Sequence, residues 1–269
     1  MPVRSQFQHI LFHRHLLWEF LRRDIMARYI GSAMGFFWSV IHPLVLLIIY
    51  TLVFEVILKV KYEEFGRETV GGFYIFCGLL PWYAFQESLI RSTSSIVDNA
   101  HLIKQVRFPA KVLPAYISLS AIVNQIIGSV IFLLILFLSR GSLHATVLFL
   151  PLVIVIQTVM FFGLGLLFST LNTYFRDIAP LVNIGSMLLM WSTPMLYTLE
   201  MVYKAPEFVQ PLVFLNPLTS LIIIHHDIIL YGQVPLLIHW LTFIGFSFMA
   251  LLIGYPVFTR QHGEFADLL

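Results

Sequence analysis

The stretch RSTSSIVDNAHLIKQVRFPAK, residues 91–111, forms a polar interruption between two long apolar segments. It contains four of the chain's 16 lysines and arginines, at Arg91, Lys104, Arg107 and Lys111. Cytoplasmic loops of membrane proteins carry an excess of these residues, so we expect this stretch to face the cytoplasm. Its position then sets the expected orientation of the apolar segments on either side.

A short helix is predicted within this stretch. Asp98 or Asn99 can accept a hydrogen bond from the free amides that open a helix, and the proline of Phe108-Pro109 ends it. Three apolar side chains recur in it at near-helical spacing, at Leu102, Ile103 and Val106. One interpretation is that the helix docks against another protein at the membrane surface. The other is a basic loop that only sets the topology.

The composition indicates an integral membrane protein. Of its 269 residues, 59% are hydrophobic and 11% are charged, whereas about 25% are charged in a soluble domain. Segments of about 20 apolar residues can cross a hydrocarbon core about 30 Å thick. Six are predicted, at 36–57, 71–90, 112–138, 145–171, 178–199 and 236–259. The expected fold class is therefore all-α, with six transmembrane helices in a single domain over residues 1–269.

Two further segments complete the expected layout. Residues 1–30 carry five arginines among apolar side chains, a pattern typical of a helix lying in the headgroup region. These arginines also place the amino terminus in the cytoplasm, and the sixth span returns the carboxyl terminus to the same side. Residues 205–230 are too apolar for a solvated loop but too interrupted for a full span. They are expected to form re-entrant or interfacial helices on the outer side.

Polar residues within the spans carry specific expectations. Pro81 is expected to break the second span and leave carbonyl groups to be satisfied inside protein. Glu87 could be a proton site, but an ion pair with Arg91, four residues later, is the favoured interpretation. Asn124 and Gln125 are expected to form hydrogen bonds across helices inside a bundle.

The sequence offers little catalytic chemistry. None of the five lysines follows a glycine, so there is no phosphate-binding loop of the type G-x-x-x-x-G-K-[ST]. The run His13-Arg14-His15 does not predict a metal site, because neighbouring residues point to different sides of a helix. A membrane transferase using His226 and Asp227 as base and orienter is the remote alternative. We therefore expect no enzyme activity, cofactor or metal in this chain.

Five motifs follow one another along almost the whole chain: RYIGSAMGFFW with HPL at residues 28–38 and 42–44, GLLPW at 78–82, NAHLIKQVRFP at 99–109, FRDI at 175–178 and NPL at 216–218. In this order they resemble the type-2 ABC exporter permeases that move O-antigen, capsule and teichoic acid polysaccharides. Each motif alone is weak, but five at matching positions are specific.

The resemblance implies a homodimer in the bacterial inner membrane, joined to two separate ATPase subunits that bind ATP and magnesium. The substrate would be a lipid-pyrophosphate-linked glycan, with a drug or small lipid as the alternative, and no nucleic acid is involved. Residues 99–109 would be the coupling helix, seated in a cleft of the ATPase. The predicted coupling residues are Asn99, Leu102, Ile103, Lys104, Val106, Arg107, Phe108, Pro109, Arg176 and Asp177.

The resemblance also implies a central pore under an external gate. The chain has 25 phenylalanines, 11 tyrosines and five tryptophans, more than interfacial belts need, and aromatic faces give sugars an apolar sliding surface. The pore candidates are Phe36, Phe37, Trp38, Trp82, Tyr83 and Trp191. The gate candidates are Asn216, Pro217, His225, His226 and Asp227. At the last three positions this chain departs from relatives that often carry arginine there.

Overall fold

The computed structural model describes residues 3–28, 38–60, 62–64, 67–105 and 108–269. Four predicted site residues, Phe36, Phe37, Val106 and Arg107, lie outside these ranges. The described chain is helical apart from its connecting loops and one short antiparallel hairpin, in which Tyr62 pairs with Thr69. This agrees with the expected helical fold class and adds the small hairpin to it.

The elements follow in chain order. They are α1 (Val3–Ala27), α2 (Trp38–Tyr50), the π-helix η2 (Thr51–Ile57), β1 (Tyr62–Glu64), β2 (Arg67–Thr69), α3 (Gly71–Asp98), α4 (Ala100–Gln105), α5 (Val112–Arg140), the 3-10 helix η3 (Ala145–Phe149), α6 (Leu150–Tyr174), α7 (Ile178–Ser192), α8 (Leu199–Lys204), α9 (Val209–Phe214), α10 (Pro217–His226), the π-helix η4 (Asp227–Tyr231), α11 (Leu237–Gln261) and α12 (Phe265–Leu268).

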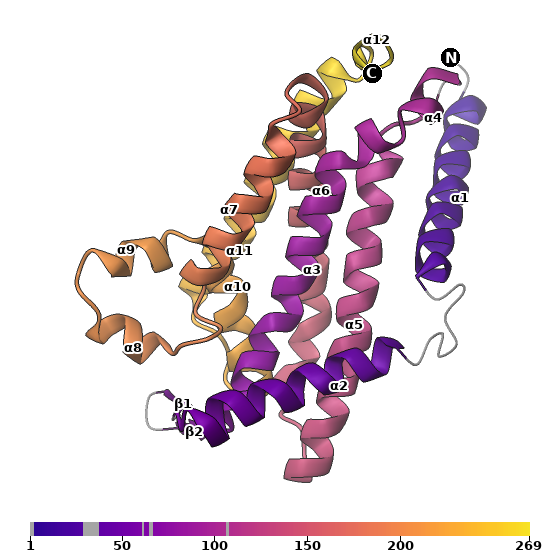
Figure 1. Ribbon diagram of the computed structural model, residues 1–269. Coiled ribbons are helices and arrows are strands. Elements are labelled where there is room, and N and C mark those ends of the chain that lie inside the picture. Colours follow the sequence, from indigo (N-terminus) through magenta and orange to yellow (C-terminus); the bar gives the residue numbers. More distant parts are fainter. Residues whose placement is uncertain (1–2, 29–37, 61, 65–66, 106–107) are drawn as a thin grey trace.

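Helix α3 lies at the centre of the bundle and packs against α5, α6, α7 and α10 (Figure 1). Helix α11 runs along α6, and two glycines allow their backbones to approach closely. A Cβ atom at Gly254 would lie 2.1 Å from the carbonyl oxygen of Gly163, so neither position has room for a side chain. Small residues at such crossings are typical of packing between membrane helices.

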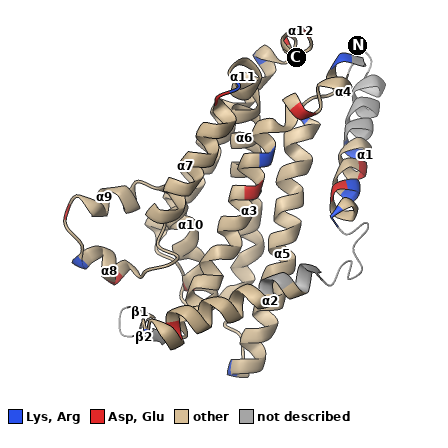
Figure 2. Cartoon of the chain, in the orientation of Figure 1, with Lys and Arg blue, Asp and Glu red and all other residues tan. Residues whose placement is uncertain are grey.

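Three helical segments are long and apolar enough to cross a membrane by length and composition: Val112–Arg140, Ala145–Tyr174 and Leu237–Gln261. They correspond to three of the six predicted spans. Three shorter apolar helical segments are Leu44–Ile57, Ile178–Ser192 and Pro217–Tyr231. Charged residues lie toward both ends of the molecule, on α1 and at one place on α3, and most of α5, α6 and α7 lacks them (Figure 2).

Two arrangements differ from the sequence-based expectations. Pro81 does not break α3, which continues as one helix from Gly71 to Asp98. Most residues of its first half are buried by neighbouring helices, and this packing outweighs the loss of one helical hydrogen bond at proline.

The other difference is the course of the first two helices. Helix α1 runs along α5 (Figure 1), whereas a helix in the headgroup plane would lie across the spans. Helix α2 instead runs across α3 and α5, which it contacts. A cluster of ion pairs and an aromatic contact hold α1 in this position, as described next.

Candidate functional site

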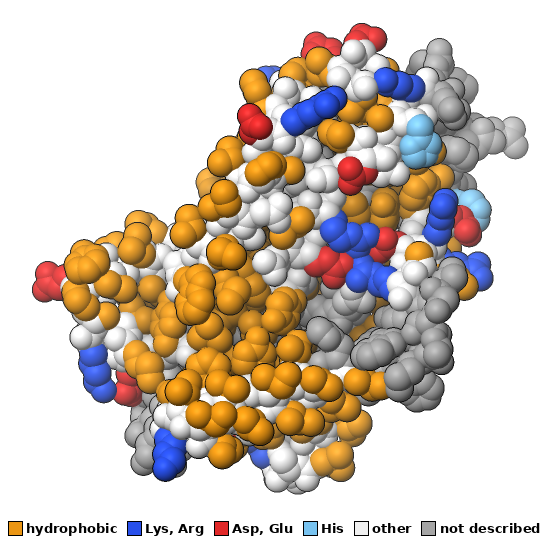
Figure 3. All heavy atoms as spheres, in the orientation of Figure 1, with side chains coloured by type: hydrophobic (Ala, Val, Ile, Leu, Met, Phe, Trp, Pro, Cys, Tyr) orange, Lys and Arg blue, Asp and Glu red, His pale blue; other side chains and the backbone are white. Residues whose placement is uncertain are grey.

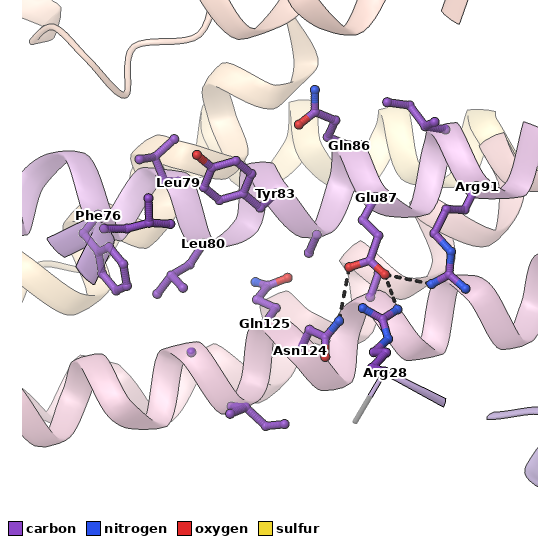
Figure 4. Close-up of a pocket in the computed structure, with 16 residues that line it drawn as sticks. Arg28, Phe76, Leu79, Leu80, Tyr83, Gln86, Glu87, Arg91, Asn124 and Gln125 are labelled. Atoms are coloured by element: carbon purple, nitrogen blue, oxygen red, sulfur yellow. Dashed lines mark hydrogen bonds and ion pairs between the residues drawn. The ribbon is translucent and has the colours of Figure 1, made fainter. Parts of the chain in front are cut away.

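A cavity of about 720 Å³ lies along α3, between that helix, α2 and α5 (Figure 4). One end is lined by apolar side chains, among them Leu46, Phe76, Leu79 and Leu80. The other end is lined by polar and charged side chains, namely Arg28, Gln86, Glu87, Arg91, Asn124 and Gln125. The cavity is therefore amphipathic along the axis of α3.

Four charged residues at the polar end form one network, here called the α1–α3 ion cluster: Asp24, Arg28, Glu87 and Arg91. Glu87 accepts from Arg91 at 2.8 Å, which confirms the predicted pair four residues apart. Arg28 also contacts Glu87, and Arg91 also contacts Asp24. The cluster thus ties α1 to the central helix with two cations and two anions.

Polar neighbours on α5 complete this network. The Ser120 hydroxyl donates to Asp24 at 2.6 Å, and the Asn124 amide donates to Glu87 at 3.2 Å (Figure 4). Asn124 thereby makes the interhelical hydrogen bond expected from the sequence. With two guanidinium groups and one amide on its carboxylate, Glu87 has the surroundings of an ion-pair residue rather than those of an isolated proton site.

The electrostatics of Asp24 follow from its surroundings. Burial raises the pKa of its carboxyl group, but hydrogen bonds from Arg91 and Ser120 and the positive charges of Arg91 and Arg28 outweigh burial. The net effect is a pKa below the usual value. The Asp24 carboxylate therefore contributes to holding α1 on the bundle only while it is ionised.

The described part of the predicted coupling stretch contains α4, Ala100–Gln105. The side chain of Asp98 or Asn99 was expected to open this helix by accepting from a free amide. Asn99 does not take that role. Instead its amide nitrogen donates to the carbonyl oxygen of Ser95 at 2.8 Å, and the Asn99 carbonyl accepts from the Leu102 amide at 3.0 Å. Asn99 thus closes α3 with its side chain and begins the next turn with its backbone.

The remaining described coupling residues occupy different surroundings. Lys104 is exposed, Leu102 and Pro109 are half-buried, and Ile103 packs against an apolar cluster of this same chain. Phe108 meets Phe20 of α1 edge to face, with ring centroids 5.7 Å apart. Arg176 and Asp177 are exposed in the turn between α6 and α7, at the same end of the molecule as α4 (Figure 1).

The described pore candidates differ in how much of their side chains is exposed. Trp82 is 1% exposed and packs near Phe85, whereas its neighbour Tyr83 is 40% exposed. Adjacent helical residues point to different sides, which explains this contrast. Trp191 on α7 is 62% exposed, and Trp38 begins α2. Among the pore candidates whose burial the structure describes, Tyr83 and Trp191 are exposed and can meet a molecule outside the chain.

The gate candidates lie mostly inside the bundle. Asn216 caps α10 by accepting from the Leu218 amide at 3.0 Å, and Pro217 occupies the first turn. His226 stacks on the Tyr74 ring and donates through Nε2 to the Tyr74 carbonyl at 3.0 Å. Asp227 follows at the start of η4. This burial does not provide the open surroundings that a transferase base needs.

His225 belongs to a second buried polar group. Its Nδ1 donates to the carbonyl oxygen of Leu221 at 2.9 Å, which leaves Nε2 to accept from the Gln125 amide 3.4 Å away. Gln125 and Gln157 exchange two hydrogen bonds of 3.0 and 2.8 Å. Gln125 thus forms the predicted interhelical bonds, and the group joins α5, α6 and α10.

Several residues of these networks carried no sequence-based expectation. They are Asp24, Ser120, Gln157, and Asn172, whose side chain accepts from the Ala179 amide at 3.1 Å near the start of α7. For Asp24 a signal existed, because it lies four residues before Arg28, the spacing of a helical ion pair. No group of three or more potential metal ligands occurs within the described ranges.

Comparisons with known proteins agree with one another. The ABC-2 type transporter family model matches residues 15–230. The chain is similar to two O-antigen export system permease proteins RfbA of Klebsiella pneumoniae, at 31% and 29% identity over 94% of this chain and 95% of each relative. It is also similar to the O-antigen export system permease protein RfbA of Myxococcus xanthus, at 30% identity over 98% of both chains.

Proposed function

Because the chain belongs to the ABC-2 type transporter family and is a transport permease rather than an enzyme, we propose that it is the membrane subunit of an ATP-driven exporter of O-antigen-like, lipid-linked polysaccharide. The observation that carries this proposal is similarity over at least 94% of the chain to three permeases named for O-antigen export. Partial matches would support only a shared fold, but here nearly the whole chain takes part.

The proposed assembly is a homodimer with two ATPase subunits in the bacterial inner membrane. The sequence contains no phosphate-binding loop, so ATP and magnesium would bind the partner ATPase. In this assembly each chain has six spans, and both termini, α4 and the α6–α7 turn face the cytoplasm. Their shared location at one end of the molecule supports that arrangement (Figure 1).

The glycan path is proposed to follow the exposed strip of α3 between α2 and α7. Tyr83 lies on this strip, and its hydroxyl is 3.4 Å from that of Tyr50 on α2. Exposed apolar side chains occur on both α2 and α7, including Ile49, Leu188 and Trp191, and hydrophobic side chains cover much of the visible face of the molecule (Figure 3). A second copy facing this strip would enclose a passage with aromatic walls, along which sugars slide without strong hydrogen bonds.

Coupling to ATP hydrolysis is proposed to occur through residues 99–109, together with Arg176 and Asp177. Leu102 is half-buried in this chain, so part of its side chain remains available to a partner. An apolar side chain of this kind suits a pocket on the ATPase surface, and the exposed Lys104 on the same helix suits the polar rim of such a contact.

The test uses inverted membrane vesicles that contain the permease and its ATPase. With ATP and lipid-linked glycan added outside, we expect glycan to accumulate in the lumen, protected from added glycosidase. Leu102→Asp should abolish most of this transport, because a charge buried without a partner costs several kcal/mol. Leu143→Asp, in the α5–η3 turn at the opposite end, is the matched control and should retain transport.

Two results would contradict the proposal. Vesicles that accumulate a drug or short lipid but no glycan would show that the substrate class is wrong. Normal glycan transport by Leu102→Asp, with the ATPase retained, would show that residues 99–109 only set the topology.

A further inference from the structure

The last helix of the chain packs directly against the proposed coupling helix. Helix α12 contacts both α4 and α6. The contact is made through a separate apolar cluster, here called the tail cluster, whose buried members are Ile96, Ala110, Leu166, Phe258 and Phe265. Ile103 of α4 packs against this cluster. The carboxyl terminus thus packs against the bundle at the end of the molecule that holds α4 (Figure 1).

Helix α4 requires such support, because its described part has six residues and the chain is no longer helical at Phe108. Isolated helices shorter than about 12 residues are marginal in water, since nucleation is costly and few hydrogen bonds follow it. Its connection to α3 is the single residue Asn99, and Pro109 lies beyond its other end. Packing of Ile103 against the tail cluster therefore adds a contact between the described part of α4 and the bundle.

Phe265 is the centre of this packing. Its side chain is 0% exposed, and it meets Phe258 of α11 edge to face with ring centroids 5.4 Å apart. The preceding residue, Glu264, accepts a hydrogen bond of 2.6 Å from the Tyr174 hydroxyl at the end of α6. The tail is thus joined to α6 and α11, the two helices that pack most closely on each other.

We propose that Phe265 is a positioning residue for α4, and that the tail cluster transmits force from α4 to the paired helices α6 and α11. This inference rests on the proposed function of residues 99–109. A movement of the ATPase that displaces α4 is transmitted to α6 and α11 only if α4 does not shift independently of them. Phe265 prevents that shift because it is a buried member of the cluster against which Ile103 packs.

The first measurement concerns the position of α4 and requires no ATPase. The rate at which a water-soluble maleimide labels Ile103→Cys is measured in membranes. The parent protein gives the background labelling, because its only cysteine, Cys77, is fully buried. Labelling should be slow with the native tail and at least about tenfold faster after Phe265→Ala, as expected when a local opening becomes easier. Leu268→Ala, a truncation of a residue 42% exposed on the same helix, should leave the rate unchanged.

The second measurement is glycan exported per ATP hydrolysed in the complete complex, at equal amounts of inserted permease. Phe265→Ala should retain the ATPase and hydrolysis but lower this ratio severalfold, and Phe265→Leu should restore it. General destabilisation lowers the amount of complex, not the ratio.

Unchanged labelling of Ile103→Cys, or an unchanged export ratio in Phe265→Ala, would overturn the positioning role. Failure of the proposed function is recognised separately, because Leu102→Asp would then export normally with the native tail. The two outcomes are therefore distinguishable in the same set of vesicles.

Discussion

At the scale of single residues, charge pairs and close contacts decide how α1 and α3 are placed. The pairing of Glu87 with Arg91 could be predicted, since both lie on one helix at a fixed spacing. The contact between Arg91 and Asp24 joins residues 67 positions apart, and no local pattern encodes such a distance. The sequence alone therefore predicted the pair of Glu87 and Arg91 on α3, but not the contacts that join α3 to Asp24 and Arg28.

Asp24→Asn should destabilise the protein and remove part of its acid sensitivity. Removing one partner of a fully buried ion pair lowers the free energy of unfolding by about 3–5 kcal/mol, whereas an exposed ion pair contributes about 0–1 kcal/mol. For the half-buried pair of Asp24 with Arg91 we therefore expect a loss of about 1–2 kcal/mol. The pKa of Asp24 is lowered in the folded state. Its stabilisation is therefore present above the unfolded pKa of about 3.9 and is lost as pH falls through the folded pKa.

The measurement is the thermal midpoint in detergent as a function of pH. The native protein should lose stability below about pH 4 more steeply than Asp24→Asn. Glu19→Gln, another substitution of an acidic side chain on α1, is the control and should follow the native curve. Parallel curves for the native protein and Asp24→Asn would contradict the role of this carboxylate.

Two adjacent aromatic residues on α3 should behave in opposite ways. Trp82→Ala should lower stability by about 3–5 kcal/mol, because its side chain is buried in the core. Tyr83→Ala should preserve folding, since its side chain is 40% exposed, and should slow export of long glycans. Fluorescence-detected gel filtration after heating measures the first effect, and the vesicle assay measures the second. Equal loss of folded protein in both variants would mean that Tyr83 serves packing of the core rather than glycan passage.

At the scale of helices, apolar length correctly predicted three long helices, whereas the break expected at Pro81 was wrong. The span expected at 112–138 is α5, Val112–Arg140, and the span expected at 236–259 is α11, Leu237–Gln261. Their length comes directly from composition. Pro81 was misjudged because the packing that keeps α3 continuous is supplied by helices far away in the sequence. The burial of His225 and His226 depends on such distant helices as well.

Gly254→Ala should separate α6 from α11. The new methyl carbon would lie 2.1 Å from the Gly163 carbonyl oxygen, which belongs to the backbone and cannot move aside cheaply. Overpacking of this kind costs about 1–3 kcal/mol, or roughly 2–4 °C of thermal midpoint per kcal/mol in a chain of this size.

The matched control is Gly245→Ala on the same helix, where no atom lies within 4 Å of the added carbon. It should be neutral or slightly stabilising, because alanine favours helix over glycine by about 1 kcal/mol. The measurement is the thermal midpoint of both variants in one detergent. Similar midpoints for both variants would mean that the close approach of the two helices is not required.

At the scale of the whole molecule, the order of helices could be predicted but their mutual placement could not. Charge bias indicates which loops share a side of the membrane, and α4, the α6–α7 turn and α12 do lie at one end (Figure 1). The course of α1 along α5 was not foreseen, because an amphipathic arginine-rich helix suits either a membrane surface or a bundle. Ion pairs tie one end of α1 to α3, and the location of α1 at the membrane surface stays a prediction.

The proposed six-span layout makes a final prediction about the segment from α8 to η4, which should re-enter from the outer side without crossing. Its ends are suited to labelling, since Lys204 and Val234 are both strongly exposed. Gly232 is unsuitable, because it has a positive φ of 63° and an added carbon would meet His144 at 2.5 Å.

In intact cells with a permeable outer membrane, Lys204→Cys and Val234→Cys should both react with an impermeant maleimide, and Lys104→Cys should react only after lysis. A crossing segment requires about 20 apolar residues, whereas α10 and η4 together span Pro217–Tyr231 before the exposed turn. Reaction of Lys204→Cys and Val234→Cys from opposite sides would show that this segment crosses the membrane and that the proposed layout of six spans is wrong.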